Sequence, residues 1–100
     1  MKTYIAGKIT NNPNFKEEFE QIERILEVQG HIPLNPANLP RGLEYEEYMH
    51  ICFAMIDISE AVCFLPNWEE SLGSKREYEY AIKNRKKIFM EKEDAIYDKN

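Results

Sequence analysis

The stretch AVCFL, residues 61–65, is apolar at every position and is bounded by turn residues. A strand with packed helices on both faces has no solvent side, so an unbroken apolar run is typical of the middle of a parallel sheet. Residues 61–65 therefore predict a central strand, and the loop PNWEES (66–71) follows it.

Shorter apolar runs on both sides of this stretch predict further strands at residues 3–6, 31–36 and 86–90. The first ends at Gly7, and the second breaks at Asn35–Pro36, where turn residues interrupt the run. The charged segment EKEDAIYDKN, residues 91–100, is expected to be a frayed helix.

Helical spacing of apolar residues predicts three helices between these strands. The first has Asn12 as N-cap with Pro13 at its first position and ends at Gly30, and the others span about 44–59 and 73–84. Its buried stripe recurs at steps of four, three and four: Phe15, Phe19, Ile22 and Leu26. The alternation predicts an α/β fold, an open, mainly parallel sheet of four to five strands with helices on both faces.

Length and composition set broad limits on what the chain can be. One hundred residues with 43% hydrophobic residues predict a single domain over residues 1–100. The net charge of -5 makes a nucleic acid polymer an unfavourable partner. The cysteines Cys52 and Cys63 lack metal-ligand spacing and are expected to be buried and reduced. With neither a signal peptide nor a membrane-length apolar segment in the sequence, we expect a cytoplasmic protein without a membrane partner.

Glu77 is an unusual residue for its place in the third predicted helix. It shares a helical row with Gly73 and Ala81, and small residues on such a row mark a close approach to a sheet or a ligand. A carboxylate there is costly unless its charge is needed. Open parallel sheets bind ligands beyond the carboxyl ends of their strands, where the predicted loop 66–73 delivers Glu77. A solvent-facing glutamate is the alternative interpretation.

Three segments carry a resemblance to a known family. YIAGKIT (4–10), LNP (34–36) and LPNWEESLGSKREYEYA (65–81) together resemble the nucleoside 2-deoxyribosyltransferase-like superfamily, and most closely its DUF4406 branch, over residues 3–89. Members include deoxyribosyltransferases and 2'-deoxynucleoside 5'-phosphate N-hydrolases, which cleave N-glycosidic bonds. The resemblance implies such an enzyme, acting on a nucleoside or nucleotide with no metal or organic cofactor.

The resemblance also implies roles for individual residues. Glu77, in the arrangement Gly73-x-x-x-Glu77, matches the family's nucleophile, and Tyr4 matches the tyrosine whose hydroxyl orients it. Tyr4 can equally be a core aromatic. The predicted substrate-binding residues are Gly7, Lys8, Ile9, Asn35, Trp68, Ser71 and Gly73.

Several of these substrate-binding residues have a purely structural alternative. Gly7 allows a ligand to approach the backbone or is a turn glycine, and Asn35 lines the crevice or forms an ordinary turn. Ser71 binds a phosphate oxygen or caps the third helix. Trp68 is expected to stack on a base or cover the crevice, and Lys8 to offset a phosphate or solvate a loop.

One departure from the family pattern concerns the general acid. Relatives carry an aspartate eight residues before the acid that corresponds to Glu60, and the matching residue here is Cys52. Asp57 is expected to be a surface acid, so the role is vacant or filled by Glu69, Glu70 or a partner subunit. The alternative function is therefore a non-catalytic module that binds a nucleotide or an ADP-ribose-like ligand.

The second predicted helix is apolar around much of its circumference. One helix in so small a domain cannot bury this surface against a single sheet, and relatives complete their crevices with residues of a neighbouring subunit. We therefore expect a homodimer or a larger homo-oligomer. The residues concerned are Tyr45, Tyr48, Met49 and Phe53.

Overall fold

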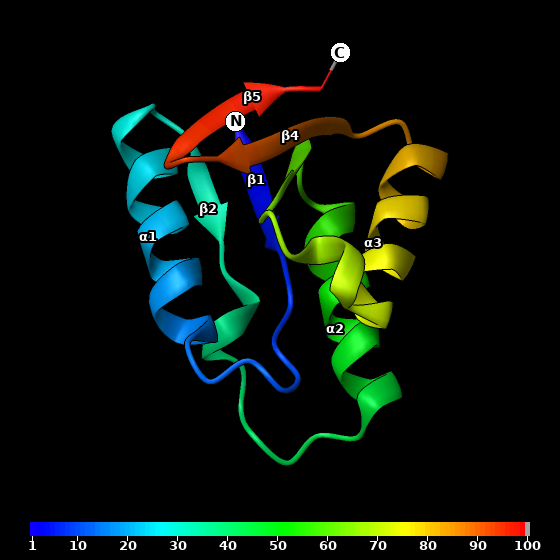
Figure 1. The fold of residues 1–100 in the computed structure, drawn as a ribbon. Helices are drawn as coiled ribbons and strands as arrows, with labels where there is room; N and C mark the ends of the chain where they lie inside the picture. The colour runs from blue at the N-terminus through cyan, green and yellow to red at the C-terminus, as the bar shows by residue number, and fades with distance from the viewer. Residues whose placement is uncertain (100) are drawn as a thin grey trace.

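The computed structural model describes residues 1–99 and contains a five-stranded sheet in the order β2-β1-β3-β4-β5 (Figure 1). Adjacent strands are parallel from β2 to β4, and β5 runs antiparallel to β4. The strands are β1 (Lys2–Ala6), β2 (Ile32–Leu34), β3 (Ala61–Phe64), β4 (Lys87–Lys92) and β5 (Ala95–Asp98). The predicted mainly parallel α/β sheet is confirmed.

Helices cover both faces of the sheet, as the alternation of elements predicts. Helix α1 (Phe15–Val28) lies on one side, and α2 (Tyr45–Asp57) and α3 (Leu72–Lys83) lie on the other (Figure 1). Two short 3-10 helices, η1 (Pro36–Asn38) and η2 (Trp68–Glu70), precede α2 and α3. Every residue of β3 is buried, in agreement with its apolar sequence.

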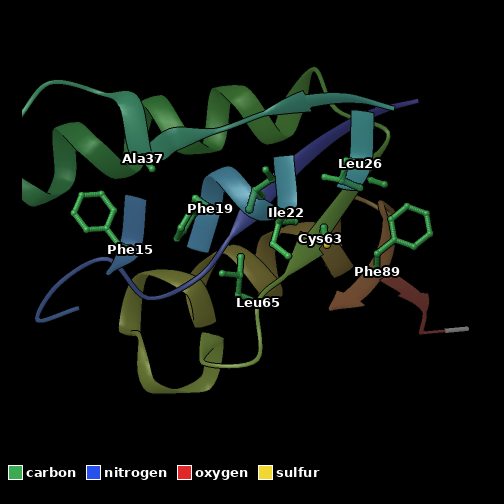
Figure 2. Close-up of a cluster of buried hydrophobic side chains, with 10 residues drawn as sticks. Phe15, Phe19, Ile22, Leu26, Ala37, Cys63, Leu65 and Phe89 are labelled. Atoms are coloured by element: carbon green, nitrogen blue, oxygen red, sulfur yellow. The ribbon is translucent and has the colours of Figure 1, made fainter. Parts of the chain in front are cut away.

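Two hydrophobic clusters, one on each face, hold the layers together. Successive strand residues point to opposite faces, so Ile5 and Cys63 pack toward α1 while Tyr4 and Val62 pack toward α2 and α3. Figure 2 shows the α1 cluster, whose helical members are the predicted stripe Phe15, Phe19, Ile22 and Leu26. The periodicity of α1 is thus explained by burial against the sheet.

The start of α1 differs from the prediction by two residues. The helix begins at Phe15, and the side-chain oxygen of Asn12 accepts a hydrogen bond from the Asn14 backbone N–H at 3.3 Å. The Asn12 amide also donates to the Lys8 carbonyl at 2.8 Å. Asn12 therefore closes the turn before the helix, and Pro13 lies outside it.

The expected frayed helix at the end of the chain is wrong. Residues 91–98 instead complete β4 and form β5, which pair through a turn at Glu93 and Asp94. Both turn residues have positive φ, 52° and 63°, as a tight two-residue hairpin requires. Ile96 packs against the α1 cluster, so burial favours the strand. Asn100, the last residue of the expected helix, lies outside the described residues.

The β2 edge of the sheet carries Pro33 in the middle of a three-residue strand. The Ile32 backbone N–H donates to the Met1 carbonyl at 3.0 Å, on the side of β1. Because alternate residues of a strand direct their backbone nitrogens to opposite sides, the Pro33 nitrogen faces away from β1, where its missing N–H removes no ladder bond. Among residues 1–99, no helix has the length and apolar character needed to cross a bilayer.

We predict that Glu93→Asn stabilises the protein. Glu93 is exposed and adopts a left-handed conformation that asparagine tolerates better, so the free energy of unfolding should rise by about 0.5 kcal/mol. Thermal unfolding followed by circular dichroism should then show a midpoint roughly 2–4 °C higher. Lys92→Asn is the control, since asparagine is unfavourable in a strand; an equal gain in both variants would contradict the assignment of the turn.

Candidate active site

A cavity of about 610 Å³ opens where the polypeptide leaves the carboxyl ends of β1 and β3. Strand β1 lies between β2 and β3, and the connections from β1 and β3 lead to helices on opposite faces of the sheet. Such a switch in strand order leaves a crevice in open α/β sheets. The walls come from residues 7–11, the segment 36–43, the first turns of α2 and the start of α3.

Glu77 lines this cavity from the second turn of α3 and is only 4% exposed. The hydroxyl of Tyr4, in β1, donates a hydrogen bond to Glu77 Oε2 at 2.5 Å. Ala81, one turn further along the same row, is fully buried. The row therefore faces the sheet, and the carboxylate is held where the cavity meets the end of β1.

Burial raises the pKa of Glu77 to about 7 because the ionised form loses its hydration. Hydrogen bonds from Tyr4 and Cys52 and the positive charge of Arg76 act in the opposite direction and lower the pKa of Glu77. Desolvation is the largest of these effects. At neutral pH the site therefore holds Glu77 divided between its protonated and ionised forms.

Cys52 is a fully buried thiol beside Tyr4 and Glu77. Its burial and the charge of Glu77 raise the pKa of Cys52 to about 12. Burial, Cys52 and Glu77 together raise the pKa of Tyr48 above its ordinary value. Both groups therefore keep their protons at neutral pH and act toward the carboxylate as neutral neighbours.

The start of α3 is fixed by two serines. Ser71 Oγ accepts from the Ser74 backbone N–H at 3.1 Å, so Ser71 is the N-cap of the helix. Ser74 Oγ donates to the Gly7 carbonyl at 2.8 Å, which ties the helix to the end of β1. At Gly73 an added Cβ would lie 3.3 Å from Met49 Sδ, so a small residue lets α3 approach α2 closely.

Gly7 is small because of packing inside the protein. An added Cβ would lie 3.1 Å from Leu65 Cβ and 3.2 Å from Phe19 Cζ, both of which are well-packed core residues. The Gly7 backbone also lines the cavity.

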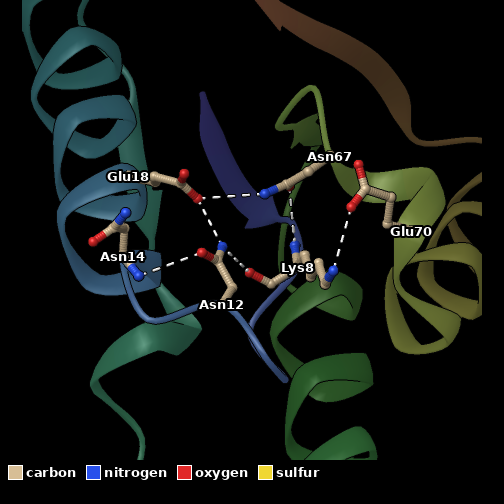
Figure 3. A network of polar contacts seen from close by, with 6 residues as sticks. All are labelled: Lys8, Asn12, Asn14, Glu18, Asn67 and Glu70. Carbon is tan, nitrogen blue, oxygen red and sulfur yellow. Dashed lines mark hydrogen bonds and ion pairs between the residues drawn. The ribbon is translucent and has the colours of Figure 1, made fainter.

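A polar network joins the loop after β1 to the loop after β3 (Figure 3). The Lys8 backbone N–H donates to Asn67 Oδ1 at 3.2 Å, and the Lys8 ammonium pairs with Glu70 at 3.2 Å. Asn67 in turn donates to Glu18 of α1 at 3.3 Å. The two loops are thus held together beside the crevice, with Lys8 and Ile9 lining the cavity.

Seven of the nine predicted site residues line this cavity: Tyr4, Gly7, Lys8, Ile9, Ser71, Gly73 and Glu77. Within residues 1–99, Trp68 and Asn35 are not brought to it. The Trp68 ring stacks on Tyr78 with centroids 4.8 Å apart. Asn35 caps η1 by accepting from the Ala37 backbone N–H and donates to Glu23.

The structure places the three acids considered for the general-acid role, Glu69, Glu70 and Asp57, in different surroundings. Glu70 lines the cavity but is ion-paired with Lys8, and Glu69 is exposed and, in the described part of the chain, lies outside the lining. Asp57 is exposed and accepts a hydrogen bond from the Tyr80 hydroxyl at 2.5 Å. In residues 1–99 no group of three or more His, Cys, Asp and Glu side chains is arranged to hold a metal ion.

Sequence reasoning missed three residues of the site: Ser74, Arg41 and Tyr48. Ser74 lies on the row next to Glu77, and its spacing from Gly7 in sequence gives no hint of their hydrogen bond. Arg41 lies in the segment between β2 and α2, and its guanidinium lies 4.8 Å from the centre of the Phe15 ring at the cavity wall. Tyr48 was assigned to an apolar helix face, although a phenol next to a ligand loop is a recognisable polar candidate.

The apolar surface of α2 is largely covered within the chain. Met49 is buried, Tyr48 lines the cavity, and Phe53 stacks on Tyr80 with centroids 4.5 Å apart. The Arg76 guanidinium lies over both Tyr45 and Phe53. The homo-oligomer expected from this helix remains a prediction.

The sheet order and the crevice define the class of protein as an open α/β fold with its site at the switch in strand order. The family model described as "Domain of unknown function (DUF4406)" matches residues 1–90, and the chain belongs to this family. No curated protein matches the chain in sequence.

Two 2-deoxyribosyltransferases are among the solved structures that share the fold. One is a 2-desoxiribosyltransferase from Leishmania mexicana, with a TM-score of 0.71 and 19% identity over 89% of this chain. This chain spans 62% of the length of that protein, less than two thirds. The other is a 2-deoxyribosyltransferase from the psychrotolerant bacterium Bacillus psychrosaccharolyticus, with a TM-score of 0.67 and 19% identity over 90% of this chain and 71% of that one.

We predict that Glu77→Gln changes how stability depends on pH. The unfolded chain releases this proton near the ordinary pKa of 4.5, whereas the folded protein holds it up to about 7. Between these values the folded state binds more protons, so the free energy of unfolding of the natural protein falls as the pH rises and then levels off. The amide removes this titration, so the variant should lose the decline and be more stable at pH 8 by up to about 3 kcal/mol.

Urea unfolding at pH 4, 6 and 8 measures this dependence. Glu79→Gln, on the same helix but exposed, is the matched control and should keep the decline of the natural protein. Equal slopes in the two variants would mean that Glu77 is not a buried titrating group.

Proposed function

We propose that the protein cleaves N-glycosidic bonds of nucleosides or nucleotides, as a 2-deoxyribosyltransferase or a 2'-deoxynucleoside 5'-phosphate N-hydrolase, with Glu77 as nucleophile. The observation that carries the proposal is a buried carboxylate in a ligand-sized cavity, held by the Tyr4 hydroxyl at 2.5 Å. A fold shared with two 2-deoxyribosyltransferases, one of them described as a biocatalyst for nucleoside synthesis, supports the same chemistry.

In the proposed reaction an ionised Glu77 oxygen attacks C1' of the sugar as the bond to the base breaks. The carboxylate stabilises the positive charge that develops on the sugar and then forms a glycosyl ester. Tyr4 positions Glu77, because its hydroxyl fixes one carboxylate oxygen and leaves the other for the sugar. Water hydrolyses the ester in a hydrolase, and a second base accepts the sugar in a transferase.

The raised pKa of Glu77 fits this role. A carboxylate that is only partly ionised near pH 7 is a stronger base and a better nucleophile than one on the surface. Burial of the ionised Glu77 carboxylate costs free energy when no ligand is bound. The positive charge that develops on the bound sugar offsets this cost in the transition state.

Cationic and hydroxyl groups that line the cavity suit the 5' end of a nucleotide. The Ser71 oxygen accepts the helix-capping hydrogen bond, which leaves its own hydroxyl proton for a ligand. Arg41 supplies a cation at the wall, whereas the charge of Lys8 is already paired with Glu70. This supports a preference for a monophosphate over a free nucleoside.

Incubation with a panel of deoxynucleosides and their 5'-monophosphates tests the proposal, with free base measured by chromatography. We expect base release from the natural protein and a loss of at least about 1,000-fold in Glu77→Ala, since removal of a nucleophile abolishes the covalent step. Glu79→Gln should retain full activity. Base release that is equal in Glu77→Ala and the natural protein would exclude Glu77 as nucleophile.

The pH dependence of kcat/KM gives a second test. The ionised form of Glu77 is the reactive one, so kcat/KM should rise with pH and reach a plateau above about 7. A rate that falls over the same range would instead indicate that the protonated form is needed.

The second candidate function is a module that binds a nucleotide or an ADP-ribose-like ligand without turnover. It is favoured by Cys52, whose thiol, with a pKa of about 12, cannot protonate a departing base efficiently. Among residues 1–99 the carboxylates that line the cavity are Glu70 and Glu77, and Glu70 is held by Lys8. Titration calorimetry that shows micromolar binding without base release would support the module.

A further inference from the structure

We propose that the Tyr48 hydroxyl is the hydrogen-bond donor that stabilises the departing base. This assignment rests on the proposed function, because it concerns the leaving group of the same reaction. Tyr48 would then stabilise the departing base, which the Cys52 thiol cannot protonate efficiently.

Tyr48 and Cys52 lie one turn apart on α2 and therefore on the same helix face. Tyr48 lines the cavity and is half-buried, whereas Cys52 lies fully buried behind the surface. Tyr48 and Glu77 line the same cavity, and the charge of Glu77 raises the pKa of both Tyr48 and Cys52. The phenol is thus close to the nucleophile on the side of the site that a ligand can reach.

The Tyr48 hydroxyl is only loosely engaged in the protein. It donates to the Pro36 carbonyl at 3.4 Å, well beyond the usual 2.5–3.0 Å for a bond between two oxygens. Such a bond is weak, so the hydroxyl can turn to a ligand acceptor at small cost. A base bound next to Glu77 offers ring nitrogens or exocyclic oxygens as better acceptors.

Within residues 1–99, the other half-buried or buried side-chain donors that line the cavity already form hydrogen bonds inside the protein. Tyr4 donates to Glu77, Ser74 to the Gly7 carbonyl, and the Lys8 ammonium to Glu70. Ser71 caps α3 six residues before Glu77 and so serves the part of a ligand away from C1'. Tyr48 is therefore the half-buried side chain of the cavity whose hydroxyl is left to donate to a ligand near Glu77.

The chemistry needs a donor at this place. As the Glu77 oxygen bonds to C1', the electron pair of the breaking C1'–N bond moves onto the base, and a hydrogen bond stabilises that negative charge. Burial raises the pKa of Tyr48, so the phenol shares its proton without giving it up. In the hydrolase, one water then supplies the proton to the base and the hydroxyl to C1', and Glu77 returns to its carboxylate form.

Two substrates with different leaving groups test the assignment. A purine deoxynucleoside leaves as a basic anion that needs a donor, whereas p-nitrophenyl 2-deoxyriboside leaves as a stable phenolate that does not. For Tyr48→Phe, which removes only the hydroxyl, kcat/KM should fall by about 100-fold for the purine substrate and less than about 3-fold for the nitrophenyl one.

The control is Tyr80→Phe, which removes a surface phenol bonded to Asp57 and should leave both rates unchanged. Turnover of the nitrophenyl substrate also shows that the Tyr48→Phe variant folds with an intact site. Equal losses on both substrates, or no loss on either, would overturn the role of Tyr48 and leave the proposed function standing. A natural protein that turns over neither of these substrates nor any deoxynucleoside 5'-monophosphate would overturn both.

Discussion

A single hydrogen bond between Tyr4 and Glu77 joins the first strand to the third helix across 73 positions of sequence. It fixes a carboxylate in a place where burial alone would drive it to the neutral form. Two neighbouring residues fix the position of α3, which carries Glu77. Ser74 ties α3 to the end of β1, and the small Gly73 lets the helix lie close to α2. The carboxylate is costly to the fold, which is typical of groups kept for chemistry.

The strand order explains why this contact borders a cavity. Strand β1 lies between β2 and β3, and its exit and that of β3 lead to different layers, which opens a crevice at this end of the sheet. The hydrogen bonds through Lys8, Asn67 and Glu18 hold those loops to each other and to α1. The ligand space is therefore a consequence of topology, and the side chains only define its polarity.

Much of the fold follows from local sequence signals. The apolar run 61–65 and the stripe of α1 predict their elements because burial on two faces, or on one, leaves a distinct period. The final hairpin was missed because Glu93 and Asp94 adopt positive φ without the Asn-Gly pair that announces such turns. Pairing with β4 and burial of Ile96, both long-range effects, outweighed the charged composition of that segment.

The site was partly predictable for the same reason. Glu77 and Gly73 stand out by spacing, but the stacking of Trp68 on Tyr78 and the turning of Tyr48 into the cavity depend on tertiary packing.

The proline in β2 has a consequence of another kind. Pro33 has no backbone N–H to donate, and the β2 edge strand has only three residues. Another chain therefore pairs poorly with this edge, which protects the small sheet from edge-to-edge aggregation.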